Sequence, residues 1–252
     1  MSDIARNSNA PRPDAHRQAV VSAVIPCLDE EAAIAAVVSA VLARNICEVV
    51  VVDGGSRDRT VDRAIAAGAR VIVEARPGYG RAIQAGIAAV RADTDILVFL
   101  DGDGSDPAEF IPALVSPIIA GQADFVLGSR TRGARERGSL APQQVMAAYV
   151  GSLLLRLVYG ARFSDLSPFR AIRRDVLDRL GMSDMTYGWN LEMLMRIAAA
   201  GVTAREIAVG QRRRIGGVSK VSGNFVAGTR AGWSMATTFI KLVLLLRRQT
   251  RV

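Results

Sequence analysis

The chain has 252 residues, of which 50% are hydrophobic and 22% charged. These proportions supply a sizeable core, and the length suits one large domain. The sequence holds 32 basic and 24 acidic side chains, a formal net charge of +8. Its one histidine, His16, lies in a polar N-terminal stretch. The composition therefore excludes a Ser-His-Asp triad, a Cys-His pair and a histidine-ligated metal from the folded body, and leaves carboxylates, a hard metal ion, backbone dipoles and basic side chains for chemistry.

The N-terminal residues 1–19 are polar and are expected to form a disordered tail. Residues 1–17 contain no apolar run, so no signal peptide is expected and the protein is expected in the cytoplasm. Cys27 and Cys47 lack CxxC spacing, which indicates a buried free thiol in a reducing compartment.

From residue 20 to residue 129, short β-branched runs alternate with alanine-rich helical stretches. That alternation is typical of βαβ units around a mainly parallel sheet. Strands are expected at Val20–Pro26, Glu48–Asp53, Arg70–Glu74, Asp95–Leu100 and Asp124–Ser129. Helices are expected at Glu30–Arg44, Thr60–Ala67 and Gly80–Arg91, with another beginning near Pro107.

The second half of the sequence is less regular. Two basic, glycine-containing loops are expected at Arg130–Arg137 and Val209–Lys220. Helical patterns cover Pro142–Val158 and Asn190–Ala200, with a short apolar run at Val176–Leu180. No internal repeat interrupts a single domain over residues 20–228.

The C-terminal segment, residues 229–252, is predicted to form an amphipathic helix. Its apolar part, Trp233–Leu246, is too short to cross a bilayer, which requires roughly 20 apolar residues. Ser234, Thr238 and Lys241 share one face, and arginines follow at the end. This pattern suits peripheral contact with an anionic membrane through residues 233–252. The alternative is a helix that packs on the core or joins two subunits of a homo-oligomer.

Asp101-Gly102-Asp103 is the strongest local signal for chemistry, because it directly follows the hydrophobic run that ends at Leu100. Ligands of open parallel sheets bind beyond the carboxyl ends of the strands. Two carboxylates at such an end can hold Mg²⁺ or Mn²⁺, which would bridge phosphate oxygens of a substrate. The alternative is an ordinary Asp-Gly turn.

Asp53 also ends a predicted strand and precedes Gly54-Gly55-Ser56. It could accept a hydrogen bond from a nucleobase or ribose, or it could belong to the cap of the following helix, as Asp58 could. Neither this run nor Gly78-Tyr79-Gly80 has GxGxxG spacing, and no GxxxxGK[ST] occurs. Dinucleotide-binding and P-loop sites are therefore not supported.

The two basic loops suit an acidic partner such as a diphosphate or a lipid phosphate. Nucleic acid is the other common partner of a basic chain. Aromatic residues make up only 5% of the sequence and no base-stacking motif is present. We therefore expect no nucleic-acid partner.

Eight segments in order resemble the motifs of family 2 glycosyltransferases, particularly dolichyl-phosphate mannose or glucose synthases and bacterial polyprenyl-phosphate relatives. They are VIPCLDE (24–30), VVDGGS (51–56) with Asp58 and Thr60, RPGYG (76–80), LDGD (100–103) with Asp106-Pro107, GSR (128–130), Asp165 with SPFR (167–170), Tyr187-Gly188 before Glu192, and RIGGVSK (214–220). The resemblance covers residues 20–225. It departs at Asp29, Gly54 and Ser105, where the family usually has Asn, Asp and, in the mannose enzymes, Gln.

The resemblance implies a GT-A fold, a Rossmann-like mixed but mainly parallel sheet flanked by helices, with an irregular acceptor-side half. By resemblance, the nucleotide sugar would contact Pro26, Glu30, Asp53, Gly55, Asp101, Gly102, Asp103, Arg214 and Lys220. Asp101 and Asp103 would bind the Mg²⁺ or Mn²⁺, and Arg130, Arg170 and Ser219 would contact the acceptor. The residues assigned to catalysis are Asp101, Asp103, Asp165 and Arg214.

The implied reaction is transfer of a hexose, with inversion, from UDP-glucose or GDP-mannose to a polyprenyl or dolichyl phosphate at the cytoplasmic face of the membrane. A phosphate acceptor is largely ionised near neutral pH and needs no strong base. The main alternative is a soluble or glycolipid hydroxyl acceptor, for which Asp165 is the candidate base unless it only caps a turn or pairs with an arginine. A nucleotidyltransferase and a non-catalytic binding protein are two further hypotheses that the sequence leaves open.

Overall fold

A computed structural model of the chain describes residues 18–216 and four later positions, 237, 239, 241 and 243. The predicted N-terminal tail and the predicted C-terminal helix therefore lie almost entirely outside the described residues. The four later positions are helical, and two of them, Phe239 and Val243, pack against the hydrophobic core. None of the helices in the described part of the chain combines the length and hydropathy needed to span a bilayer.

The described residues contain a seven-stranded sheet in the order β3-β2-β1-β4-β6-β5-β7. Strands β3, β2, β1 and β4 run parallel, β6 is antiparallel to both β4 and β5, and β7 is parallel to β5. The expected mixed, mainly parallel α/β fold is confirmed. The strands are β1 (Val21–Cys27), β2 (Glu48–Asp53), β3 (Arg70–Val73), β4 (Ile96–Phe99), β5 (Phe125–Ser129), β6 (Arg170–Arg173) and β7 (Ala204–Ala208).

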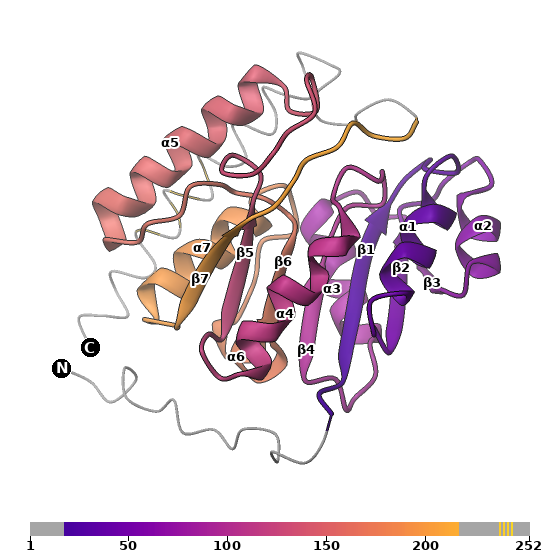
Figure 1. Cartoon of the computed structure of the whole chain (residues 1–252), viewed down its shortest axis with the longest axis horizontal. Helices are drawn as coiled ribbons and strands as arrows, with labels where there is room; N and C mark the ends of the chain where they lie inside the picture. Colours follow the sequence, from indigo (N-terminus) through magenta and orange to yellow (C-terminus); the bar gives the residue numbers. More distant parts are fainter. Residues whose placement is uncertain (1–17, 217–236, 238, 240, 242, 244–252) are drawn as a thin grey trace.

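Helices cover both faces of this sheet (Figure 1). Helices α1, α2 and α4 pack on one face, and α3, α6 and α7 pack on the other, with α5 against α7. Their bounds are α1 (Ile34–Leu42), α2 (Thr60–Ala66), α3 (Tyr79–Ala89), the 3₁₀ helix η2 (Ala108–Phe110), α4 (Ile111–Ile119), α5 (Pro142–Tyr159), α6 (Arg174–Leu180) and α7 (Trp189–Ala199).

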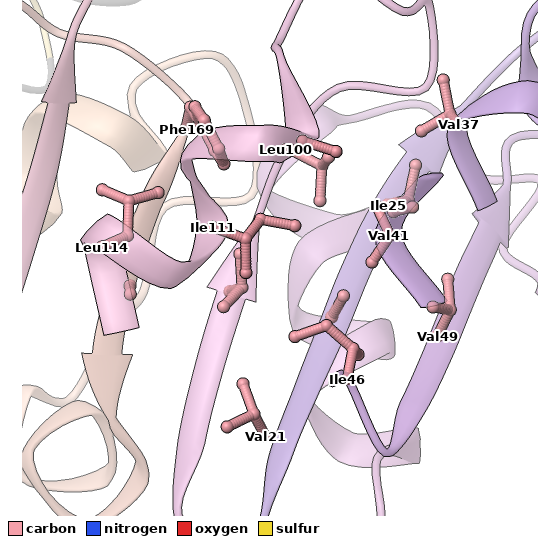
Figure 2. Close-up of a cluster of buried hydrophobic side chains, with 14 of the residues drawn as sticks. Val21, Ile25, Val37, Val41, Ile46, Val49, Leu100, Ile111, Leu114 and Phe169 are labelled. Atoms are coloured by element: carbon pink, nitrogen blue, oxygen red, sulfur yellow. The ribbon is translucent and has the colours of Figure 1, made fainter. Parts of the chain in front are cut away.

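The core has two parts because the central strands are buried on both faces, as parallel strands usually are. Along β1, Val21 and Ile25 point towards α1 and α4, whereas Val24 points towards α3. Figure 2 shows the first of these clusters, in which side chains of β1, β2, α1 and α4 meet. The uninterrupted apolar runs of β1, β2 and β4 follow from this double burial.

Several local expectations need correction. The helix expected from Glu30 begins at Ile34 and is preceded by a turn at residues 31–33, in which the Ala33 N–H donates to Glu30 O. The helix expected near Pro107 is divided into η2 and α4. Strands β6 and β7 were not expected from the sequence. Both cysteines are free, but only Cys27 is buried and Cys47 is exposed.

The fold brings the ends of β1, β2 and β4 together. Strand β1 lies between β2 and β4, and the chain leaves β1 on one side to form β2 and returns on the other to form β4. Ligands of open α/β sheets bind at such a switch point. Cys27, Asp53 and the residues after Phe99 stand at this edge.

Candidate active site

The turn after β4 carries the two predicted metal-binding carboxylates. The Asp101 N–H donates to Asp106 Oδ2 at 3.0 Å, and the Ser105 N–H donates to Asp103 Oδ1 at 2.9 Å. Gly102 is buried, and a Cβ there would lie 3.1 Å from Cys27 Cβ. These contacts hold Asp101 and Asp103 at the carboxyl end of the sheet, as the sequence predicts.

Asp106 is a buried carboxylate that was not assigned to the site from the sequence. Within the part of the chain that the structure describes, its Oδ1 has no hydrogen-bond partner, while its Oδ2 accepts the Asp101 N–H. Burial raises the pKa of Asp106 to about 6. Burial, followed by the neighbouring charges of Asp106 and Asp103, raises the pKa of Asp101. In the sequence, the Asp106-Pro107 pair that follows Asp101-Gly102-Asp103 was the signal that could have pointed to Asp106.

Arg214 joins two predicted ligand residues that follow different strands, Glu30 and Asp103. Its Nη2 donates to Glu30 Oε1 at 2.5 Å, and its Nη1 lies 3.8 Å from Asp103 Oδ2. Glu30 follows β1 and Asp103 follows β4, so the guanidinium group bridges the two strand ends. The structure thus brings together Glu30, Asp103 and Arg214 as the sequence predicts.

Asp53 is the last residue of β2, and its carboxylate accepts hydrogen bonds from the turn that follows it. Its Oδ2 accepts the N–H groups of Gly55 and Ser56 at 2.9 and 2.8 Å, and its Oδ1 accepts the Ser56 hydroxyl. Gly55 has φ +89°, a conformation that glycine adopts at little cost. Pro26 lies beside Val52 in the β1–β2 ladder. Pro26, Asp53 and Gly55 therefore lie at the same edge as Glu30.

Arg130 and Asp165 form a buried pair next to this edge. Arg130 donates through Nε and Nη2 to the two Asp165 oxygens at 3.0 and 2.8 Å, and its backbone N–H donates at 2.8 Å. These bonds lower the pKa of Asp165 despite its burial. Of the two interpretations of Asp165, the geometry matches the arginine partner, because both carboxylate oxygens are engaged.

Arg170 lies inside the protein. Its side chain is fully buried, and its guanidinium donates to the backbone carbonyls of Leu166, Ser167 and Asn190. Burial lowers the pKa of Arg170 to about 10. The structure therefore does not bring Arg170 to a surface where an acceptor could reach it. Its predicted acceptor role came from the motif alone, which carries no information on side-chain direction.

Backbone contacts join the two basic loops to each other and to the turn at Asp101-Gly102-Asp103, here called the DGD turn. Gly133 and Val209 make a very close backbone approach, and the Gln211 N–H donates to Ala134 O at 3.0 Å. The next residues continue onto the turn, where the Arg212 N–H donates to Ser105 O at 3.0 Å. Ser219 and Lys220, predicted in the second loop, lie outside the described residues.

The site supplies suitable ligands for a hard divalent cation. Asp101 and Asp103 offer carboxylate oxygens, and burial together with neighbouring negative charge raises the pKa of Asp101. Among the residues that the structure describes, no group of three or more acidic, cysteine or histidine side chains surrounds a metal position. Two carboxylates that leave other positions to water and phosphate oxygens match the way Mg²⁺ is usually bound.

A sheet switch point with paired carboxylates and an arginine across them is typical of α/β enzymes that act on phosphorylated nucleotide substrates. A family model described as "Glycosyl transferase family 2" matches residues 22–181. The chain belongs to this family and is a glycosyltransferase that uses a nucleotide sugar.

Relatives among curated proteins extend over most of the chain. An uncharacterized glycosyltransferase of Mycobacterium tuberculosis is 40% identical over 208 residues, covering 81% of this chain and 90% of the relative. A dolichyl-phosphate hexose transferase of Haloferax volcanii is 33% identical over 201 residues, covering 78% and 84%. Both matches are long enough to include the site.

Solved structures show the same fold. Glucosyl-3-phosphoglycerate synthase of Mycobacterium tuberculosis in complex with phosphoglyceric acid has a TM-score of 0.72 and 25% identity, covering 90% of this chain and 81% of that chain. The same enzyme in complex with Mn²⁺, UDP-glucose and phosphoglyceric acid has a TM-score of 0.70 and 25% identity, covering 91% and 81%. These matches confirm the predicted GT-A-like fold.

Proposed function

We propose that the protein transfers a hexose, with UDP-glucose as the first donor to test, to a hydroxyl group of a soluble acceptor that also carries a phosphate. The observation that carries this proposal is the pair Arg135 and Arg137 on the basic loop that pairs with Gln211, since the residue after Gln211 binds Ser105 O next to the DGD turn. Both side chains are exposed and neither forms an ion pair within the described residues. This soluble alternative is better supported by the comparisons than the lipid phosphate that the sequence favoured.

The backbone contacts between the two loops support an anionic acceptor at this position. Arg135 forms an isolated β-bridge with Gln211, and the next residue, Arg212, donates its N–H to Ser105 O. Other arginines there are already paired, Arg132 with Glu206 and Arg212 with Glu109. The guanidinium groups of Arg135 and Arg137 can offer two-point hydrogen bonds to a phosphate without first breaking an ion pair to any described residue.

The relatives support the same acceptor chemistry. One solved relative binds UDP-glucose with Mn²⁺ and phosphoglyceric acid, and another relative is a dolichyl-phosphate hexose transferase. Their named acceptors share a phosphate group and differ in what carries it. A phosphorylated acceptor is therefore the chemistry that both relatives have in common.

In the proposed transfer, the site residues would have different roles. A divalent cation bound by Asp101 and Asp103 would neutralise charge on the departing nucleoside diphosphate. Arg214 stands where it can contact the same diphosphate. Asp165 is a poor base because Arg130 holds it ionised and occupies its oxygens.

The test is a transfer assay with UDP-glucose and Mn²⁺, in which mass spectrometry detects the product. Phosphoglyceric acid is expected to be glucosylated, and glyceric acid, which lacks the phosphate, is not. Arg135→Ala with Arg137→Ala is expected to raise the acceptor KM about tenfold or more. Arg44→Ala removes an exposed arginine near the opposite edge of the sheet and is the matched control. Equal turnover of both acids would contradict the proposal.

A lipid phosphate is the second candidate, and the outer face of α5 favours it. Six large apolar side chains are exposed there, Tyr149 by 68% and Leu157 by 72%: Val145, Met146, Tyr149, Val150, Leu153 and Leu157. Figure 1 shows α5 along the edge of the molecule. The helix has no acidic residue, and Arg156 and Arg162 are exposed near its end. An apolar face with nearby cations suits an anionic bilayer surface.

Vesicle binding separates the two candidates. If the acceptor is a lipid phosphate, the full chain is expected to sediment with phosphatidylglycerol vesicles and not with phosphatidylcholine vesicles. Tyr149→Glu with Leu157→Glu would then abolish sedimentation and transfer to polyprenyl phosphate. If the wild-type chain stays in the supernatant and glucosylates phosphoglyceric acid, the lipid candidate is rejected, and with it the predicted location at the membrane face.

A further inference from the structure

Arg214 occupies the space between Glu30 and Asp103, the two groups assigned to the nucleoside and to the metal. Its guanidinium is 2.5 Å from Glu30 Oε1 and 3.8 Å from Asp103 Oδ2. The side chains are largely shielded from solvent, with exposed fractions of 23% for Arg214, 9% for Glu30 and 20% for Asp103. At these distances and this burial, the Arg214 guanidinium offsets much of the negative charge of Glu30 and Asp103.

The backbone holds the Arg214 segment on the turn. The Ile215 N–H donates to Asp103 O at 3.0 Å, and the Ile215 side chain covers Gly104, where an added Cβ would lie 2.6 Å away. The Arg214 Nε donates to Gly216 O at 2.7 Å. Backbone contacts therefore hold the Arg214 segment on the turn, and without a donor the guanidinium is held by Glu30 and by Gly216 O.

A divalent cation and Arg214 therefore compete for Asp103. Without a nucleotide, a cation that binds Asp103 must approach the Arg214 charge or displace it from Asp103. A nucleoside diphosphate changes this balance, because its phosphate oxygens offer Arg214 another anionic partner. When Arg214 moves to the diphosphate, the repulsion at Asp103 is reduced.

We infer that Arg214 is an internal cation that holds the metal site closed until the donor diphosphate draws it away. This inference rests on the proposed donor and adds the order of binding at the same site. Because Arg214 would repel the cation and bind the diphosphate, its removal is expected to change the affinity for both ligands. Arg214→Ala is expected to tighten binding of Mn²⁺ alone and to weaken binding of UDP alone.

The experiment titrates the metal-free full chain with Mn²⁺ and follows the electron paramagnetic resonance signal of free Mn²⁺, without nucleotide. Arg214→Ala is expected to bind Mn²⁺ about 5- to 100-fold more tightly than wild type, the usual range of such couplings. Arg213→Ala is the matched control, since it removes the same charge one residue away. The Arg213 Nε donates to Arg137 O, away from Asp103. Its Mn²⁺ affinity is expected to change less than twofold.

Equal Mn²⁺ affinities in Arg214→Ala and Arg213→Ala would overturn the inference, because only long-range charge would then be involved. Arg214→Gln serves the same purpose if the alanine variant does not fold, as judged by circular dichroism. UDP is then added to wild type. If UDP tightens Mn²⁺ binding while both alanine variants match each other, the inference fails and the donor proposal stands. If UDP neither binds nor changes the Mn²⁺ affinity, both the inference on Arg214 and the donor proposal fail.

Discussion

Arg130 binds Asp165 through two parallel hydrogen bonds, from Nε to Oδ2 at 3.0 Å and from Nη2 to Oδ1 at 2.8 Å. Asp165 is fully buried, and the Arg130 side chain is 12% exposed. The pair connects the end of β5 with the segment that leads into β6, two strands that neighbour each other in the sheet. Its geometry assigns Asp165 a positioning role and leaves it little capacity to accept a proton.

Asp165→Asn is expected to destabilise the fold. The substitution leaves the Arg130 charge buried without its counter-ion, which typically costs about 3–5 kcal/mol. Urea unfolding measures this loss. The paired replacement of Arg130 and Asp165 by Met should be less destabilising than Asp165→Asn alone, because neither charge of the pair remains. Wild-type stability in Asp165→Asn together with a large loss of turnover would instead support the base assignment.

Asp101→Asn and Asp103→Asn are each expected to lower kcat by about 10²–10³-fold, the usual effect of removing one electrostatic contact to a charged transition state. The melting temperature is not expected to fall in Asp101→Asn, because burial and neighbouring carboxylates disfavour the Asp101 charge. Steady-state kinetics and thermal unfolding check these outcomes. Asp93→Asn changes an exposed carboxylate paired with Arg91 and is the control. Wild-type turnover in both site variants would remove the DGD motif from the mechanism.

The regular half of the fold was predictable because its signals are local. The runs that form β1, β2 and β4 are apolar and end in turn residues, so their double burial is visible in the sequence. Strand β6, RAIR, was not predictable, since it has four residues and two of them are arginines. Its place depends on pairing with β4 and β5, which are distant in sequence.

The candidate site was predictable in its residue types and only partly in its contacts. Asp101, Asp103 and Glu30 follow strands, and the order of parallel strands brings their ends together. No local pattern shows that Arg170 donates to backbone carbonyls inside the protein or that Arg130 is held by Asp165. These contacts depend on the conformation of the loops in the irregular half, where hydrophobic periodicity gives no information, although periodicity did predict the helices α5 and α7 there.

Gly133→Ala is expected to raise the acceptor KM while leaving the UDP affinity within about twofold of wild type. A Cβ at Gly133 would lie 1.6 Å from the Val209 carbonyl oxygen, so the two basic loops must separate. Such overpacking typically costs about 1–3 kcal/mol, here concentrated at the edge of the site. Kinetics with phosphoglyceric acid and calorimetry with UDP measure the two effects. Gly210→Ala, whose Cβ would meet nothing closer than 3.3 Å, is the control, and an equal effect in both variants would contradict this explanation.

Asp106→Asn is expected to raise the melting temperature of the metal-free protein at neutral pH, by an amount that depends on pH. Burial raises the pKa of Asp106 to about 6 in the folded protein, above its ordinary value, so the folded state holds this proton more tightly than the unfolded chain does. The resulting stabilisation is complete below about pH 4 and is lost as the pH rises through about 6. Wild type therefore carries an unfavourable buried charge at neutral pH that Asn lacks, while the Asn oxygen can still accept the Asp101 N–H. Thermal unfolding in EDTA from about pH 4 to about pH 8 should show a difference between variant and wild type that grows with pH. A constant difference across this range would mean that Asp106 does not titrate there.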